Sequence, residues 1–468
     1  MQLHESLPSR GRSRKAVFPS GYKHLRLEDS SAIADANSIE LNHAVSLARR
    51  RLIPFLLLMY IVSFLDRANI GFVKQTLQTS VGISTSAYAL GAGLFFVSYA
   101  LFEVPSNLIL HRVGARLWLS RIMVSWGLVS MATIFVTGPR SFYLLRLLLG
   151  ATEAGFFPGV IFYLIHWFPN RSRGQVFGMF YFGAPLAFIF GAPISGLLLQ
   201  MRPWLSLHNW QWMFLAEGTM AVLVGIWAFR YLDDSPSNAA WLPVLEKHAL
   251  VEELSQEESE RRSRGPIAVL PMLLDLRVLY FVLIYFLLQM SVYGVIFYLP
   301  AQVAGILYRP TGVIVGLVTA VPWICALIVT FWLPRMADRW NKHRQFAALT
   351  MLISGCASLV FPTSGPMIGL LTLSIAASGL IAVQPLFWKF PTGYLAGSAA
   401  AGGIAFINAL GNVGAFFAPN AKVWADVHFA STKAGLYLLA ALTLVNAGLM
   451  AAMHSSDGPT VASHRSTT

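Results

Sequence analysis

Long apolar stretches separated by short polar connections run through most of the chain. Each is about 20 residues long, the length an α-helix needs to cross the hydrocarbon core of a bilayer. Connections as short as residues 138–140 make neighbouring helices antiparallel, and an even number of crossings puts both termini on one side. The pattern predicts an all-α integral membrane protein with twelve transmembrane helices, at residues 52–73, 85–109, 117–137, 142–165, 175–199, 211–231, 278–300, 311–333, 346–362, 367–388, 394–418 and 432–453.

Composition and charge agree with a membrane protein and fix its expected orientation. Of the 468 residues, 56% are hydrophobic and 12% are charged, about half the charged share of a soluble protein. The net charge of +13 would suit a nucleic-acid partner in a soluble protein. Here, however, 26 Lys and Arg residues fall on the side of the termini, six on the other side and two inside spans. Because cations accumulate on the cytoplasmic side, we expect both termini in the cytoplasm and no nucleic-acid partner.

A polar segment divides the twelve spans into two sets of six. The first 48 residues lack the apolar core of a secretory signal peptide, and the acidic run from Glu252 to Glu260 is typical of a solvated helix. We therefore predict a cytoplasmic tail at 1–48, an N-terminal six-helix bundle at 49–232, a cytoplasmic loop at 233–276, a C-terminal six-helix bundle at 277–453 and a cytoplasmic tail at 454–468.

Sequence markers repeat between the two sets at a nearly constant offset. Pro193 and Pro419 are 226 residues apart, spans 1 and 7 also start 226 apart, and Arg112 and Arg339 are 227 apart. Two repeats related by an axis along the membrane normal, with a site between them at mid-membrane, form a transporter architecture.

Two short basic turns are candidate gating elements. Arg112 and Arg116 follow span 2, and Asp338 and Arg339 follow span 8. An arginine there can bond the last carbonyls of a helix, so such a turn can latch two helices in one conformation and release them in another. Anchoring by the positive-inside rule is the alternative for each arginine.

Four charged residues inside spans 1 and 4 are the main functional candidates. Asp66 and Arg67 lie in span 1, and Arg146 and Glu153 lie two turns apart in span 4. A buried charge is costly and marks a functional site when a partner can be named. An anionic substrate that takes an arginine from a carboxylate leaves the carboxylate to bind a proton, which couples the two ligands. A static ion-pair network between the two spans is the alternative.

The remaining polar residues inside the spans differ between the two halves. Glu103 in span 2 fits a functional and a structural role equally, and the position of Glu217 favours a structural one. The spans of the C-terminal half contain no acidic residue in their interiors. Their candidate polar side chains are neutral: Gln289, Tyr293, Gln384, Trp388, Asn408 and Asn412.

Sequence motifs for other chemistry are missing. The two cysteines, Cys325 and Cys356, lie in apolar spans without disulfide or metal-ligand spacing. The chain contains no Gly-Lys dipeptide and hence no nucleotide-binding P-loop, and no H-E-x-x-H motif. We expect no enzyme activity, no catalytic residues, no metal and no cofactor.

Several motifs resemble one transporter family. They are residues 64–71 (FLDRANIG), 103–107 (EVPSN), 146–159 (RLLLGATEAGFFPG), 210–218 (WQWMFLAEG) and 408–412 (NALGN). Over about residues 45–450 the chain resembles the major facilitator superfamily, and within it the anion:cation symporter family of tartrate, phthalate, sugar-acid and allantoate permeases.

The resemblance implies specific roles for named residues. Asp66 and Glu153 would be the proton-coupling carboxylates, Arg67 a ligand of the substrate carboxylate, and Arg146 a partner of Asp66. Three further residues would line the substrate site: Tyr99, Trp388 and Asn408.

We therefore expect a multi-pass protein of the cell membrane, in a bacterium the inner membrane. It would act as a monomer that imports a small organic anion together with protons by alternating access. Two alternatives stay open. One is a proton-coupled drug or metabolite exporter of the same fold, and the other is a nutrient sensor that does not transport.

Overall fold

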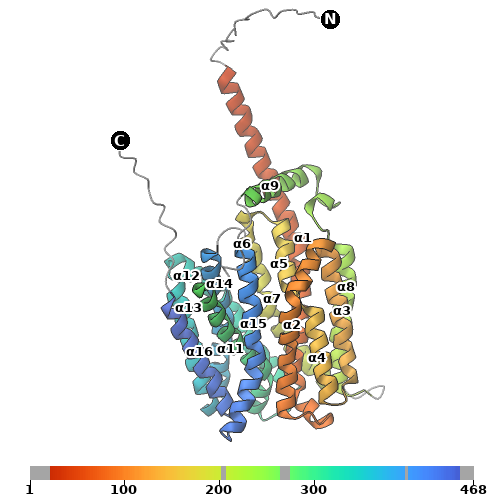
Figure 1. The fold of residues 1–468 in the computed structure, drawn as a ribbon, viewed down its shortest axis with the longest axis vertical. Helices are drawn as coiled ribbons and strands as arrows, with labels where there is room; N and C mark the ends of the chain where they lie inside the picture. Colours follow the sequence, from red (N-terminus) through yellow and green to blue (C-terminus); the bar gives the residue numbers. More distant parts are fainter. Residues whose placement is uncertain (1–21, 202–206, 264–274, 396–398, 454–468) are drawn as a thin grey trace, which may run out of the picture.

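Helices make up nearly the whole computed structural model (Figure 1), which describes residues 22–201, 207–263, 275–395 and 399–453. Among these residues there is no strand. In chain order the helices are α1 (Tyr22–Ser80), α2 (Thr85–Val113), α3 (Ala115–Ala132), α4 (Pro139–Glu153), α5 (Phe156–Trp167), α6 (Asn170–Tyr181), α7 (Gly183–Gln200), α8 (Asn209–Tyr231), α9 (Val244–Ser263), α11 (Leu276–Leu307), α12 (Val313–Trp340), α13 (His343–Val360), α14 (Pro366–Tyr394), α15 (Ala399–His428) and α16 (Ala434–Ala452).

Most of the predicted spans correspond to helices that can cross a membrane. Within the described residues, eleven helical stretches are long and apolar enough to do so. The 30-residue helix α15 lies where the span at 394–418 was predicted, although it is not one of the eleven. Large apolar side chains such as Leu101, Leu223 and Leu283 are exposed on the outside of the bundle. A surface of this kind is suited to lipid.

Two predicted spans are broken helices. The span at 142–165 consists of α4 and α5, which are separated at Ala154 and Gly155. The span at 175–199 lies in α6 and α7, which meet at Phe182. Non-helical backbone at membrane depth is tolerated where it is enclosed by protein, and broken helices of this kind often mark transporter binding sites.

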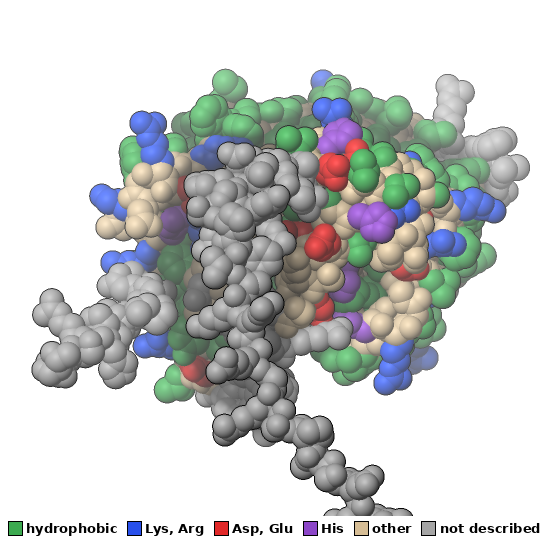
Figure 2. All heavy atoms as spheres, turned by 90° about the horizontal axis from the view of Figure 1, so that it is seen from above, with side chains coloured by type: hydrophobic (Ala, Val, Ile, Leu, Met, Phe, Trp, Pro, Cys, Tyr) green, Lys and Arg blue, Asp and Glu red, His purple; other side chains and the backbone are tan. Residues whose placement is uncertain are grey.

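The two ends of the bundle differ in structure. At one end, here called the α9 end, α9 crosses α1 and α6. Glu257 of α9 forms a salt bridge with Arg173 of α6 at 2.9 Å, and Glu246 accepts a bond from His43 of α1 at 2.8 Å. Figure 2 shows Lys and Arg side chains around the rim of this end. Residues 1–21 and 454–468 of the predicted tails lie outside the described residues.

At the opposite end, called the α1–α2 end, α1 finishes at Ser80 and α2 starts at Thr85. Small residues bring helices of the two halves close together on this side. A Cβ built on Gly93 of α2 would lie 2.7 Å from the ring of Phe416 of α15. One on Gly196 of α7 would lie 2.4 Å from the carbonyl oxygen of Gly312, next to α12. Small residues permit such close helix approach, and here they hold α2 against α15 and α7 against the start of α12.

Candidate functional site

A buried ion pair joins the first and fourth predicted spans. The Arg67 guanidinium of α1 contacts Oε1 of Glu153 of α4 through Nη2 at 2.7 Å and Nε at 2.8 Å. Ser63, one turn before Arg67, donates to the same oxygen at 2.8 Å. The side chain of Glu153 is fully buried, and that of Arg67 is 11% exposed. The structure thus brings together two of the four predicted charged residues in a direct contact.

The break between α4 and α5 places Glu153. It is the last residue of α4, and the chain leaves the helix at Ala154. Gly155 then has φ 86°, a left-handed conformation that favours glycine. A Cβ on Gly155 would also lie 2.4 Å from Oγ of Ser106 in α2, so a larger residue has no room. The glycine directly after the carboxylate therefore lets the chain turn while it stays packed on α2.

The same arginine reaches the other half of the protein. Its Nη1 donates to the hydroxyl of Tyr293 in α11 at 3.1 Å. Arg67 and Tyr293 are 226 residues apart, the offset of the sequence repeat, so they occupy matching positions in spans 1 and 7. Both therefore face the axis between the halves, and the arginine connects them.

Aromatic rings surround this charge. The Arg67 guanidinium carbon lies 5.2 Å from the ring centre of Phe64, 5.4 Å from that of Phe95 and 5.1 Å from that of Tyr99. Cation–π attraction stabilises a guanidinium at such distances. The predicted site residue Tyr99 is therefore a wall of the arginine site.

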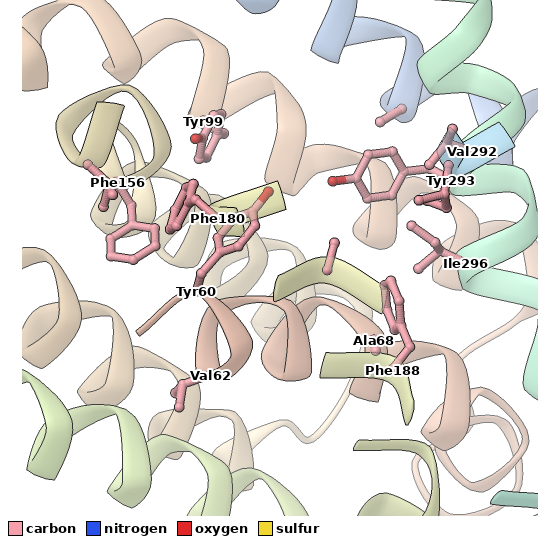
Figure 3. Close-up of a cluster of buried hydrophobic side chains, with 14 of the residues drawn as sticks. Tyr60, Val62, Ala68, Tyr99, Phe156, Phe180, Phe188, Val292, Tyr293 and Ile296 are labelled. Carbon is pink, nitrogen blue, oxygen red and sulfur yellow. The ribbon is translucent and has the colours of Figure 1, made fainter. Parts of the chain in front are cut away.

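A small internal cavity lies between the halves next to the arginine. Its volume is ≈ 40 Å³, enough for a few water molecules and far below the ~300 Å³ of a typical ligand pocket. Figure 3 shows Tyr60 of α1 and Tyr293 of α11 with their hydroxyl oxygens directed toward the space between them. The helices must separate before a substrate can enter. The lining residues are Tyr60, Phe64, Tyr181, Ala184, Gln289, Val292, Tyr293, Ile296, Thr330, Ile381, Gln384 and Pro385.

The predicted pair of Asp66 and Arg146 is not joined by a salt bridge in the described residues. Asp66 accepts a short hydrogen bond from Ser130 of α3 and one from Asn69 at 3.4 Å. Arg146 donates to the carbonyl oxygen of Gly91 at 3.4 Å and lies 5.0 Å from the ring centre of Phe95. Both charged side chains are buried. Arg146 is thus a buried cation that is not directly paired with a carboxylate of the described residues in this conformation.

Two other predicted site residues lie on the C-terminal half. Asn408 of α15 donates to Glu103 of α2 at 2.9 Å, a second polar contact between the halves. Trp388 of α14 packs edge-on against Tyr285 with ring centres 4.9 Å apart. It does not line the internal cavity, whereas Gln384, one turn earlier, does.

Each candidate gating turn bonds within its own half. The backbone N–H of Arg116 donates to Asp234 at 2.9 Å, and its guanidinium lies over the ring of Phe229. Asp338 accepts bonds from Lys389 of α14 and His343 of α13. Arg112 and Arg339 are exposed. A latch between the halves through these turns stays a prediction.

Sequence reasoning gave no role to three polar residues that complete the site: Ser63, Asn69 and Ser130. Asn69 lies in the motif that carries the resemblance, one helical turn after Asp66, and that spacing is the signal that could have found it. Ser130 is one of three serines in α3, so only its contact with Asp66 distinguishes it from the others. In the part of the chain that the structure describes, no three His, Cys, Asp or Glu side chains are grouped to hold a metal ion.

Comparison with known proteins identifies the family. A sequence model described as Major Facilitator Superfamily matches residues 56–419. The chain belongs to the major facilitator superfamily. Its fold is also that of a solved member, the inward-open xylose transporter XylE from E. coli. The TM-score is 0.67 at 14% identity, over 86% of this chain and 95% of that one.

Several bacterial transporters are similar to this chain in sequence. Inner membrane transport protein RhmT of Escherichia coli is 45% identical, over 86% of this chain and 94% of its own. A protein of Agrobacterium vitis named "Putative tartrate transporter" is 40% identical, over 85% and 88%. A quinolone resistance transporter of Acinetobacter baumannii is 39% identical, over 84% and 91%. This major facilitator protein is accordingly a multi-pass membrane transporter and not an enzyme.

Proposed function

We propose that this transporter imports a small organic anion, with a carboxylate like that of tartrate, together with protons. The observation that carries the proposal is the contact of Arg67 with both Glu153 and Tyr293. One buried cation lies at the interface of the halves, beside a cavity, and is held by a carboxylate that a substrate carboxylate can replace. The tartrate name of one relative supports this substrate class.

Competition for the arginine would couple the two ligands. An arriving carboxylate that binds Arg67 deprives Glu153 of its counter-ion. A fully buried carboxylate without a counter-ion carries a large desolvation cost, so Glu153 then binds a proton. Arg146, which makes no salt bridge here, is available to Asp66 when the helices rearrange. Substrate and proton thus move together, and neither moves efficiently alone.

The charge distribution supports a defined orientation of the transporter in the membrane. With the α9 end in the cytoplasm, the cation-rich ends of the spans face inward. The close contacts of Gly93 and Gly196 then seal the outer side. Alternating access would open these contacts and close the α9 side, and the contact of Asn408 with Glu103 is one that must change.

The test is uptake by proteoliposomes. The wild-type protein is expected to accumulate tartrate when the outside is more acidic, and collapse of the gradient with an uncoupler should abolish accumulation. Glu153→Gln is expected to lose proton-driven accumulation while it still exchanges internal for external tartrate, because a neutral side chain mimics the protonated form. Wild-type accumulation that survives the uncoupler would refute proton coupling.

A second candidate is proton-coupled drug export, which the quinolone resistance relative favours. Once the helices separate, the aromatic side chains of Tyr60, Phe64 and Tyr181 around the cavity would also suit a planar drug. The two functions differ in what Arg67 does. Arg67→Gln is expected to abolish tartrate uptake, whereas a drug exporter that does not bind a carboxylate would keep its resistance phenotype.

A further inference from the structure

A second buried carboxylate lies near Asp66. Glu217 of α8 accepts a hydrogen bond from the side-chain amide of Asn69 at 2.7 Å, and Asn69 also donates to Asp66 at 3.4 Å. On its other oxygen Glu217 accepts from Ser195 of α7 at 3.1 Å. Asp66 and Glu217 are 2% and 3% exposed. One amide thus connects two carboxyl groups inside the bundle.

Neither carboxyl group has a salt-bridged cation in the described residues. Their hydrogen-bond donors are neutral: Ser130, Asn69 and Ser195. Among the described residues, the buried Oδ2 of Asp66 and Oδ1 of Asn69 have no hydrogen-bond partner. Burial of two like charges this close together is strongly unfavourable, which favours a proton on one of the two carboxyl groups. A protonated carboxyl group of the pair can donate its O–H to one of these oxygens.

Four buried polar residues lie at increasing depth from the α1–α2 end. Counted from the helix ends at about 1.5 Å per residue, Ser195 lies about 8 Å deep, Glu217 about 12 Å, Asn69 about 16 Å and Asp66 about 21 Å. Glu217 thus lies between the end of the bundle and the candidate coupling residue. The row lies on the side of α1 that packs on α7 and α8 and contacts Ser130 of α3, away from the Arg67–Tyr293 contact.

We propose that Glu217 is a further proton-binding site, which exchanges protons between the α1–α2 end and Asp66. In the transfer, the carboxyl of Glu217 releases its proton to a water molecule and Asp66 accepts one from it, with no net change in charge. Asn69 holds the two carboxyl groups in place and carries no proton itself. Its role is that of a positioning residue.

The position of Ser195 connects proton entry to conformation. Ser195 precedes Gly196, whose close approach to Gly312 seals α7 against the start of α12. Separation of α7 from α12 on the outer side would let water reach this part of α7. Glu217 would then load from outside only while the outer end is open, and protons would not leak through the closed state.

The first test needs no substrate. Infrared spectra of the reconstituted protein, titrated with pH, report the carbonyl stretch of protonated carboxyl groups. The wild type is expected to show one such band that is lost in Glu217→Gln and a second that is lost in Asp66→Asn. Ser354→Ala, which alters a buried serine that donates only within its own helix, should leave both bands unchanged. A Glu217→Gln spectrum identical to that of the wild type would overturn the proposal.

The second test measures transport and rests on the proposed function. Glu217→Gln keeps the hydrogen-bonding shape, so it should fold with wild-type melting temperature and still exchange tartrate. Its proton-driven tartrate accumulation should be slower by about 100-fold or more, the lower end of the loss when a proton-transfer group is removed. Accumulation at the wild-type rate would overturn the relay alone. A wild type that is not proton-driven would instead refute the proposed function, while the infrared result still decides whether Glu217 binds protons.

Discussion

Substitution of Arg67 by lysine tests whether the site recognises a carboxylate by charge alone or by the shape of the guanidinium. The arginine uses three nitrogens at once: two contact Glu153 at 2.7 and 2.8 Å, and the third donates to Tyr293 at 3.1 Å. Lysine keeps the charge but has one nitrogen on a flexible stem. Lysine can hydrogen-bond to one of these partners. It cannot bind a carboxylate in bidentate geometry while it also contacts Tyr293 of α11.

The expected size of the effect follows from the lost contacts. A hydrogen bond to a charged group contributes about 1.5–3 kcal/mol. If a bound anion takes the place of Glu153, the lysine variant loses one such bond. Because about 1.4 kcal/mol corresponds to a tenfold change in affinity, the concentration of tartrate for half-maximal uptake should rise about 10- to 150-fold.

The assay is the initial rate of tartrate uptake into proteoliposomes at a fixed pH gradient and a series of tartrate concentrations. Arg140→Lys is the matched control, because Arg140 is exposed at the start of α4, away from the site. The melting temperature of the purified variants verifies that both are folded. An Arg67→Lys protein with wild-type concentration dependence would show that the shape of the guanidinium does not bind the substrate, and the reasoning from geometry would be wrong.

Three further predictions concern the interfaces around the site. Gly93→Val should abolish uptake by keeping α2 away from α15, since its Cβ would lie 2.7 Å from Phe416, whereas Gly448→Val, with open space around it, should transport normally. Gly150→Ala should lower the free energy of unfolding by about 1–3 kcal/mol, because its Cβ would lie 2.1 Å from the carbonyl oxygen of Phe95. Gly178→Ala, with open space around it, is the control. Equal melting temperatures of the two variants would contradict the close packing at Gly150. A double-mutant cycle of Glu103→Gln and Asn408→Ala should give a coupling free energy of about 0.5–3 kcal/mol in stability, and additive effects would mean that their contact contributes nothing.

Local sequence signals predicted the spans well but not their breaks. Apolar length is a property of each segment and does not depend on its neighbours, so the twelve spans could be placed from composition alone. The stop of α4 at Glu153 depends on Gly155 lying against Ser106 of α2, a contact between segments about fifty residues apart. The sequence contains the glycine, but only packing shows that the helix ends there.

The residues of the candidate site could be found from the sequence, but their contacts could not. The four charged residues in spans 1 and 4 stood out because ionisable groups are rare and costly in a membrane. Which of them pair could not be read from the sequence, since helix rotation and tilt decide it. In the structure Arg67 pairs with Glu153, while Asp66 bonds to Ser130 and Asn69.

By itself the sequence determined that this protein spans a membrane and which charged residues lie in its apolar spans, and it predicted two related halves. Hydrophobic length, charge asymmetry and a repeat offset of 226 residues are readable along the chain because each arises from local composition. Only the tertiary structure placed Tyr293 on Arg67 and linked Glu217 to Asp66 through Asn69. Those contacts join helices distant in sequence, and hydrogen bonds are made or lost over a fraction of an ångström, a precision that only the packing of the whole bundle supplies.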